Sequence, residues 1–175
     1  MALFFWDLEA ELSFSPEEKV QSENSIDVPT SIIEIAQLSQ FDETGVLSQR
    51  LESPELSYTD SINMVTMTNP TIYLQGKSEH WLATSNRGEF DQTNNHIRLI
   101  GDVRLSQNST GDSSEPVKMS TEQINYYSES QIAETHMAVV IETDGHYIES
   151  QGMSLDIANS IFILTERVRS THEPM

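Results

Sequence analysis

The chain has 175 residues and a net charge of −19, from 9 basic and 28 acidic side chains. Nucleic-acid binding rests on Lys and Arg side chains that neutralise phosphates, so this charge excludes a nucleic-acid partner. The absence of cysteine excludes a disulfide framework and thiolate chemistry. Apolar residues make up 37% of the chain, which predicts one domain with a modest core and many side chains facing water.

The N-terminal part differs in texture from the rest. Residues 1–6, MALFFW, are apolar and run directly into acidic residues. A membrane span needs about 20 apolar residues, so this stretch is either an ordinary N-terminus or the remnant of a transmembrane anchor. Residues 7–29 are rich in acidic residues and contain Ser and Pro, which predicts a flexible acidic linker.

Residues 30–172 have the pattern of an all-β domain. Short stretches rich in β-branched residues alternate with turn signals, beginning with residues 31–41. Gly45 follows in a turn, where a positive φ is favourable for glycine. Pro54 predicts an edge position or a bulge in the next strand. No window shows a sustained helical apolar period, so we predict a sandwich or barrel with few helices.

A hairpin-sized unit recurs in the second half of the chain. Residues 80–105 contain a strand-like segment, a turn centred on residues 87–88, a polar turn at residues 94–95 and a long alternating strand. The same rhythm returns at residues 118–142 and again at residues 147–171. A chain that repeats hairpins without a catalytic constellation is expected to build a binding surface.

Alternation within the strands predicts one apolar and one polar face. In the strand that follows His96, the side chains of Leu99 and Val103 fall on the apolar face. Gly101 lies between them, and we interpret it as structural because glycine permits close backbone approach.

The last strand, residues 161–169, carries Arg167 and Arg169 on its polar face in an otherwise acidic chain. A terminal strand with a free edge can accept a strand from a partner. The alternative is that it pairs within its own sheet and that arginines guard its outer edge.

The sequence shows no constellation typical of an enzyme or a metal site. Its five histidines do not fall at metal-site spacings with a nearby carboxylate, and no phosphate-binding, dinucleotide-binding or nucleophile-elbow motif occurs. Abundant acidic residues allow a glycosidase-like carboxylate pair, which leaves a carbohydrate-active enzyme as a minor alternative. Glu79 lies near Trp81, but we interpret Trp81 as a core or rim aromatic. We predict no catalysis, no metal and no cofactor.

Several short motifs occur in order along residues 30–172. They are Asp42-x-x-Gly45 with Leu51, Thr68-Asn69-Pro70, Trp81 with Gly88, Ile97-x-Leu99-x-Gly101-Asp102-Val103, and the closing ERVRST from Glu166 to Thr171. Together, their order and spacing resemble the LptC family of lipopolysaccharide-export proteins. The related bridge protein LptA and the N-terminal domain of LptD share the Ile-x-Leu-x-Gly-x-Val repeat, so an LptA-like soluble bridge component is an alternative.

The resemblance implies a twisted β-jellyroll of antiparallel strands, open along one side. It also implies an N-terminal anchor at the periplasmic face of the inner membrane, with residues 1–6 as its remnant. Proteins of this family accept lipopolysaccharide from an inner-membrane ABC transporter at the N-terminal edge and pass it to a bridge protein at the C-terminal edge. The expected edge residues are Ile33 and Ile35 for the transporter, and Ile161, Ile163, Arg167 and Arg169 for the bridge protein.

Acyl chains need a continuous apolar trough, and burial of apolar surface supplies roughly 25 cal/mol per Å². The inward apolar residues are therefore the predicted lipid-binding residues, and each of them also qualifies as plain core. A structural adaptor without lipid binding is the alternative function. The predicted lipid-binding residues are Ile32, Ala36, Leu38, Leu47, Leu51, Val65, Met67, Ile72, Leu74, Leu99, Val103, Phe162, Leu164 and Val168.

Overall fold

The computed structural model describes residues 28–42, 44–76, 79–109, 117–143 and 145–172. The regular elements of these segments are β-strands and one short 3-10 turn, Asp60–Ile62, which confirms the all-β prediction. The anchor remnant and nearly all of the acidic linker lie outside the described residues. The strands are β1 Ser31–Phe41, β2 Leu47–Thr59, β3 Met64–Thr68, β4 Thr71–Gln75, β5 Glu79–Thr84, β6 Arg87–Asp91, β7 His96–Ser109, β8 Lys118–Tyr127, β9 Ile132–Thr143, β10 His146–Asp156 and β11 Ile161–His172.

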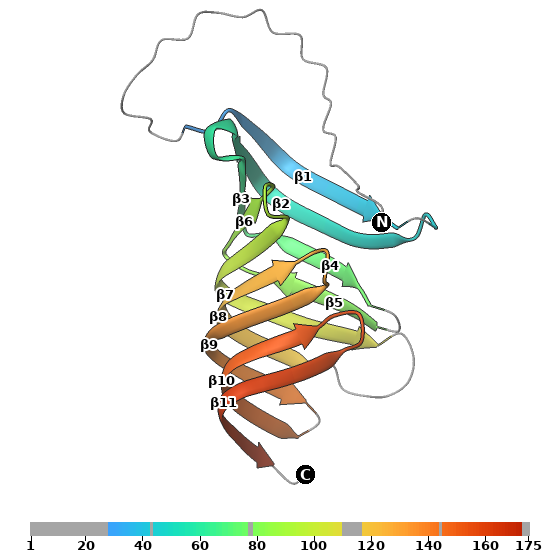
Figure 1. The fold of residues 1–175 in the computed structure, drawn as a ribbon, viewed down its shortest axis with the longest axis vertical. Helices are drawn as coiled ribbons and strands as arrows, with labels where there is room; N and C mark the ends of the chain where they lie inside the picture. The colour runs from blue at the N-terminus through green and yellow to red at the C-terminus, as the bar shows by residue number, and fades with distance from the viewer. Residues whose placement is uncertain (1–27, 43, 77–78, 110–116, 144, 173–175) are drawn as a thin grey trace, which may run out of the picture.

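The strands form one antiparallel sheet that folds over on itself. β2 pairs with β4 through its first half and with β3 through its second half. β7 pairs in the same way with β6 and then β5. Because β3 pairs with β6 and β4 with β5, these strands close into a ring. β8 to β11 extend the sheet from β7, and β1 extends it from β2, so β1 and β11 lie at opposite ends of the long axis (Figure 1).

Long strands bend where they pass from one half of the folded sheet to the other. In β7 the bend falls at Gly101 and Asp102, which both have positive φ, and the pairing with β8 shifts there. In β1 it falls at Ile35, and the opposite residue Pro54 also drops out of the ladder. Because proline has no N–H to donate, Pro54 fits this interruption. Each bend lets one strand contribute to both halves.

The bend at Ile35 changes which residues of β1 face inward. Ile33 pairs with the buried Leu56 and Ala36 is buried, so the inward positions are three residues apart across the bend. Ile32 therefore points outward and is 62% exposed. The inward prediction for Ile32 is wrong because strict alternation takes no account of the bend.

Gly88 does not lie in a turn. Arg87–Asp91 forms β6, and the chain turns instead at Ser85 and Asn86. A Cβ atom on Gly88 would lie 2.8 Å from Cε of Met67, so this glycine allows β6 to pack closely on β3. The predicted turn at residues 87–88 is wrong because glycine marks close approach as well as turns.

Candidate functional site

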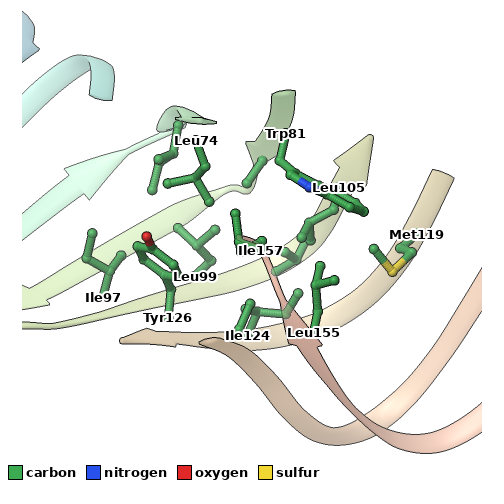
Figure 2. Close-up of a cluster of buried hydrophobic side chains, with 14 of the residues drawn as sticks. Leu74, Trp81, Ile97, Leu99, Leu105, Met119, Ile124, Tyr126, Leu155 and Ile157 are labelled. Atoms are coloured by element: carbon green, nitrogen blue, oxygen red, sulfur yellow. The ribbon is translucent and has the colours of Figure 1, made fainter. Parts of the chain in front are cut away.

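The inward faces of the two halves meet in one continuous apolar interior. Figure 2 shows side chains from β4, β5, β7, β8 and β10 gathered in this layer. Val103 and Leu155 are fully buried, and Ile124 is 2% exposed. The side chains that line this interior are apolar, which suits contact with long hydrocarbon groups.

Most of the predicted lipid-binding residues line this interior. Leu38, Phe162 and Leu164 are partly buried against it, whereas Leu47 is half-buried at the start of β2. Val168 is 52% exposed and does not pack into the interior, because it lies in the terminal strand just after Arg167, which has positive φ. Contact of any of these residues with lipid stays a prediction. The fully packed members of the set are Ala36, Leu51, Val65, Met67, Ile72, Leu74, Leu99 and Val103.

The predicted lipid-binding set contains no residue between Val103 and Phe162. The strands in that range, β8, β9 and β10, nevertheless contribute a large share of the interior. The alternation of Ile124 and Tyr126 was a usable signal, but the pairing of β8 with β9 shifts between Ser120 and Asn125 and breaks the pattern. The buried apolar residues that were missed include Met119, Ile124, Tyr126, Val139, Ile141, Met153, Leu155 and Ile157.

A row of buried hydroxyl groups follows the bends of the strands. Ser150 Oγ lies 2.9 Å from the carbonyl oxygen of Gly152, and Thr121 Oγ1 donates to that of Ala138 at 2.8 Å. Such groups satisfy backbone atoms where a bend disturbs the ladder. Sequence reasoning missed the row because the residues have no regular spacing. Its buried members are Ser53, Ser85, Thr121, Thr135 and Ser150.

The first edge of the sheet is β1, which in the described structure pairs with β2 and with no other strand. Ile33 and Ile35, the predicted edge residues, are 44% and 89% exposed. An unpaired edge with exposed apolar side chains is a template for strand addition.

The second edge is β11, which pairs with β10 alone among the described strands. Ile161 and Ile163 are 54% and 62% exposed, and Arg167 and Arg169 are exposed as well. Arg169 lies opposite Glu149 in the ladder. The outer edge of β11 is free among the described strands, and its use by a partner stays a prediction.

The pKa shifts of the following described residues arise from burial or from local hydrogen bonds. Burial raises the pKa of Tyr126 to about 12. Hydrogen bonds from Thr44 hold the pKa of Asp42 below its usual value, and those from Asn94 do the same for the pKa of Asp91. No three His, Asp or Glu side chains gather into a potential metal site within the described segments. None of the helical segments described there is long and apolar enough to cross a membrane.

Comparisons with known proteins agree with this geometry. Residues 1–173 match a protein family described as lipopolysaccharide-assembly, LptC-related. Among solved structures, the chain is similar to LptH, the LptA-homologous periplasmic component of the lipopolysaccharide transport device of Pseudomonas aeruginosa. That match has 14% identity and a TM-score of 0.56, and it covers 72% of this chain and 95% of LptH, so it shows a shared fold. Among curated proteins no match is found.

Proposed function

The chain belongs to the LptC-related family of lipopolysaccharide-assembly proteins, and we propose that it is a lipopolysaccharide relay. It accepts the lipid from an inner-membrane ABC transporter and passes it to a periplasmic bridge protein, at the periplasmic face of the inner membrane. It catalyses no reaction, and the energy for transport is supplied elsewhere. The observation that carries this proposal is the continuous apolar interior between two unpaired strand edges.

The lining of the interior supports a role in lipid binding. Met67, Met119 and Met153 are 1%, 3% and 2% exposed and come from three different strands. Methionine is flexible and adapts to groups of variable shape. The inward side chains already pack against one another, so acyl chains enter where the halves of the sheet separate. Because methionine side chains can change shape, the free-energy cost of separating the two halves stays small. The lipid then binds without a fixed position and can move on.

The two edges support a role in strand exchange with partners. β1 presents apolar side chains and a free ladder edge, which suits a strand of the transporter's periplasmic part. β11 presents Arg167 and Arg169 beside its free edge, which suits a bridge-protein strand with acidic neighbours. A partner at each end would extend the sheet and continue the apolar interior.

A photo-crosslinking experiment tests lipid binding. Crosslinkers at the inward positions Met67 and Phe162 should capture lipopolysaccharide. Crosslinkers at Thr66 and Ile163, the adjacent residues on the opposite face, should not. If folded variants fail to capture lipid at both inward positions, the relay proposal is wrong.

The second candidate is a structural adaptor that joins partners through its edges and carries no lipid. The exposed apolar and basic residues of β1 and β11 favour it, because edges alone suffice for assembly. Charge reversal at Arg167 and Arg169 would then abolish assembly, while wedging bulky side chains into the interior without unfolding would have no effect on transport.

A further inference from the structure

Two polar atoms at one end of the apolar interior have no partner in the described structure. Nε1 of Trp81 and Oε2 of Glu79 are both buried, and neither makes a hydrogen bond. Trp81 as a whole is 1% exposed. Buried polar groups are nearly always satisfied, so two orphans on one short strand require an explanation.

Both residues lie on the inward side of β5. The alternation along this strand places Glu79, Trp81 and the buried Ala83 on the same face. Across the interior, the ring of Phe162 meets that of Trp81 edge-on, with 5.7 Å between centroids. Figure 2 shows Trp81 at the rim of the buried cluster, next to Leu105.

This end of β5 is where the interior meets the outside. The carbonyl oxygen of Ile157, in the turn between β10 and β11, lies 2.8 Å from the place of a Cβ atom on Gly76. The turn thus packs directly against the end of β4, beside the start of β5. A cavity of about 270 Å³ adjoins β5 at Trp81 and its two neighbours in the chain, and Leu47 and Leu74 also line it. The indole of Trp81 therefore stands at a boundary between apolar chains and water, and Glu79 lies next to it on the same face of the strand.

The chemistry of the two atoms defines the group that would satisfy them. An indole N–H donates and cannot accept, while a carboxylate oxygen accepts. Because Glu79 and Trp81 are two positions apart on one face of β5, one group that satisfies both would contain an acceptor and a donor, at the head of an apolar chain. The amide that joins an acyl chain to a sugar has both. An ester linkage has the acceptor alone.

We infer that Trp81 and Glu79 form a polar subsite for the amide-linked head of an acyl chain of the lipid, with Trp81 Nε1 donating to the amide carbonyl and Glu79 accepting from the amide N–H. This inference rests on the proposed lipid-binding function and adds a preference to it. The remaining interior accepts any apolar chain, and the subsite selects chains joined through an amide.

A matched pair of lipids tests the subsite. The probes are a synthetic 2,3-diacyl glucosamine 1-phosphate, whose C2 chain is joined by an amide, and the matching 2,3-diacyl glucose 1-phosphate, whose C2 chain is joined by an ester. Binding to the full chain is measured by calorimetric titration. The unaltered protein should prefer the amide lipid by about tenfold, which corresponds to one or two net hydrogen bonds. Glu79→Met should remove most of this preference, because only the amide offers Glu79 a donor. Trp81→Phe should weaken both lipids, because the amide and the ester both offer a carbonyl acceptor.

Phe162→Leu is the control, because it disturbs the same ring contact without changing a polar atom. It should weaken both lipids equally and leave the preference intact. A spectroscopic measurement adds a second readout: in a Trp6→Phe background the amide lipid should shift the emission of Trp81 to longer wavelength more than the ester lipid does.

The outcomes separate the subsite from the relay. If the unaltered protein binds both lipids equally, or if Glu79→Met keeps the full preference for the amide lipid, the subsite is wrong while lipid binding stands. If the unaltered protein binds neither lipid and inward crosslinkers capture none, the proposed function is wrong and the subsite with it.

Discussion

β7 and β11 are both long strands that bend at a residue with positive φ, yet they differ in how many neighbours they have. β7 lies between β8 on one side and β5 and β6 on the other, and its inward Leu99 is 2% exposed. β11 pairs with β10 alone in the described structure, and its Ile163 is 62% exposed. The difference indicates that inner strands carry more of the packed interior, whereas β11 has one edge free among the described strands.

The largest expected effect separates these two roles. Leu99→Ala should lower the free energy of unfolding by about 2–5 kcal/mol, because truncation leaves a cavity in a packed interior. Ile163→Ala, at an exposed edge position, should change it by less than about 0.5 kcal/mol. Denaturant unfolding followed by circular dichroism measures both variants. Similar losses at the two positions would mean that β11 is as much a part of the core as β7.

Alkaline pH tests the interior without truncating a side chain. Burial raises the pKa of Tyr126 from 10.0 to about 12, so the fold favours the neutral phenol. The stabilisation is fully present below the unfolded pKa of 10 and is lost as pH rises through the folded value of about 12. At about 1.4 kcal/mol per pKa unit it amounts to roughly 2–3 kcal/mol.

The comparison of the unaltered protein with Tyr126→Phe isolates this effect. The free energy of unfolding is measured by urea unfolding at each pH. Between about pH 9 and pH 12 it should fall more for the unaltered protein than for the Phe variant, because only the unaltered protein has a Tyr126 that ionises on unfolding. Parallel stability profiles for the two proteins would show that Tyr126 is not held neutral by burial.

Gly152→Ala tests the bend in β10 at the place where β10 packs closely against β11. Gly152 has a φ of +86°, and an added Cβ atom would lie 2.7 Å from Oγ1 of Thr165 in β11. Positive φ costs about 1–2 kcal/mol for alanine, and the contact adds to it, so we expect a loss of about 2 kcal/mol or more. Gly45→Ala is the matched control, because its φ is +83° and nothing lies within 4 Å.

Thermal or urea unfolding should show a smaller loss for Gly45→Ala than for Gly152→Ala. The double variant Gly152→Ala, Thr165→Ala should recover part of the difference, since the atom that the new Cβ meets is removed. Equal losses at the two glycines, or no recovery in the double variant, would show that crowding against β11 has no part in the effect.

The smallest expected effect has the opposite sign and lies at the other edge. Ile35 has a φ of 56°, which is strained for a β-branched residue. Its side chain is 89% exposed, so packing does little to offset this strain. Ile35→Asn should raise the free energy of unfolding by about 1 kcal/mol, because Asn tolerates this conformation. A lower melting temperature in calorimetry would contradict this. The strain fits a residue kept for contact with a partner.

The sequence predicted the inward face of β7, and in β1 it predicted the positions after the bend but not Ile32 before it. The bend at Gly101 and Asp102 leaves Leu99 and Val103 on the same face, so simple alternation stays correct. The bend at Ile35 moves the inward positions by one residue and exposes Ile32. Gly101 indicates the bend in β7, because glycine adopts a positive φ without strain. The sequence around Ile35 contains no glycine, and a β-branched residue rarely adopts a positive φ, so the bend in β1 could not be predicted at this residue.

The polar features of the interior were beyond sequence reasoning because they depend on distant pairings. Ser150 Oγ lies 3.3 Å from the carbonyl oxygen of Glu166, and this follows from the register of β10 on β11. Trp81 likewise packs against Phe162, which belongs to β11, a strand far from β5 in the order of the sheet. The terminal arginines could be predicted, since their position in an otherwise acidic chain is visible in the sequence itself.

Transfer of preloaded lipid tests most directly whether the interior and the two edges divide the work as proposed. Lipopolysaccharide is loaded into the chain and offered to an LptA-like bridge protein that carries an inward photo-crosslinker. We predict that charge reversal on β11, Arg167→Glu with Arg169→Glu, retains the load and passes on little of it. The matched pair on β1, Ile32→Glu with Ile35→Glu, should transfer as the unaltered protein does once loaded. Undiminished transfer from the β11 variant, or equal failure of both, would contradict the proposed hand-over edge.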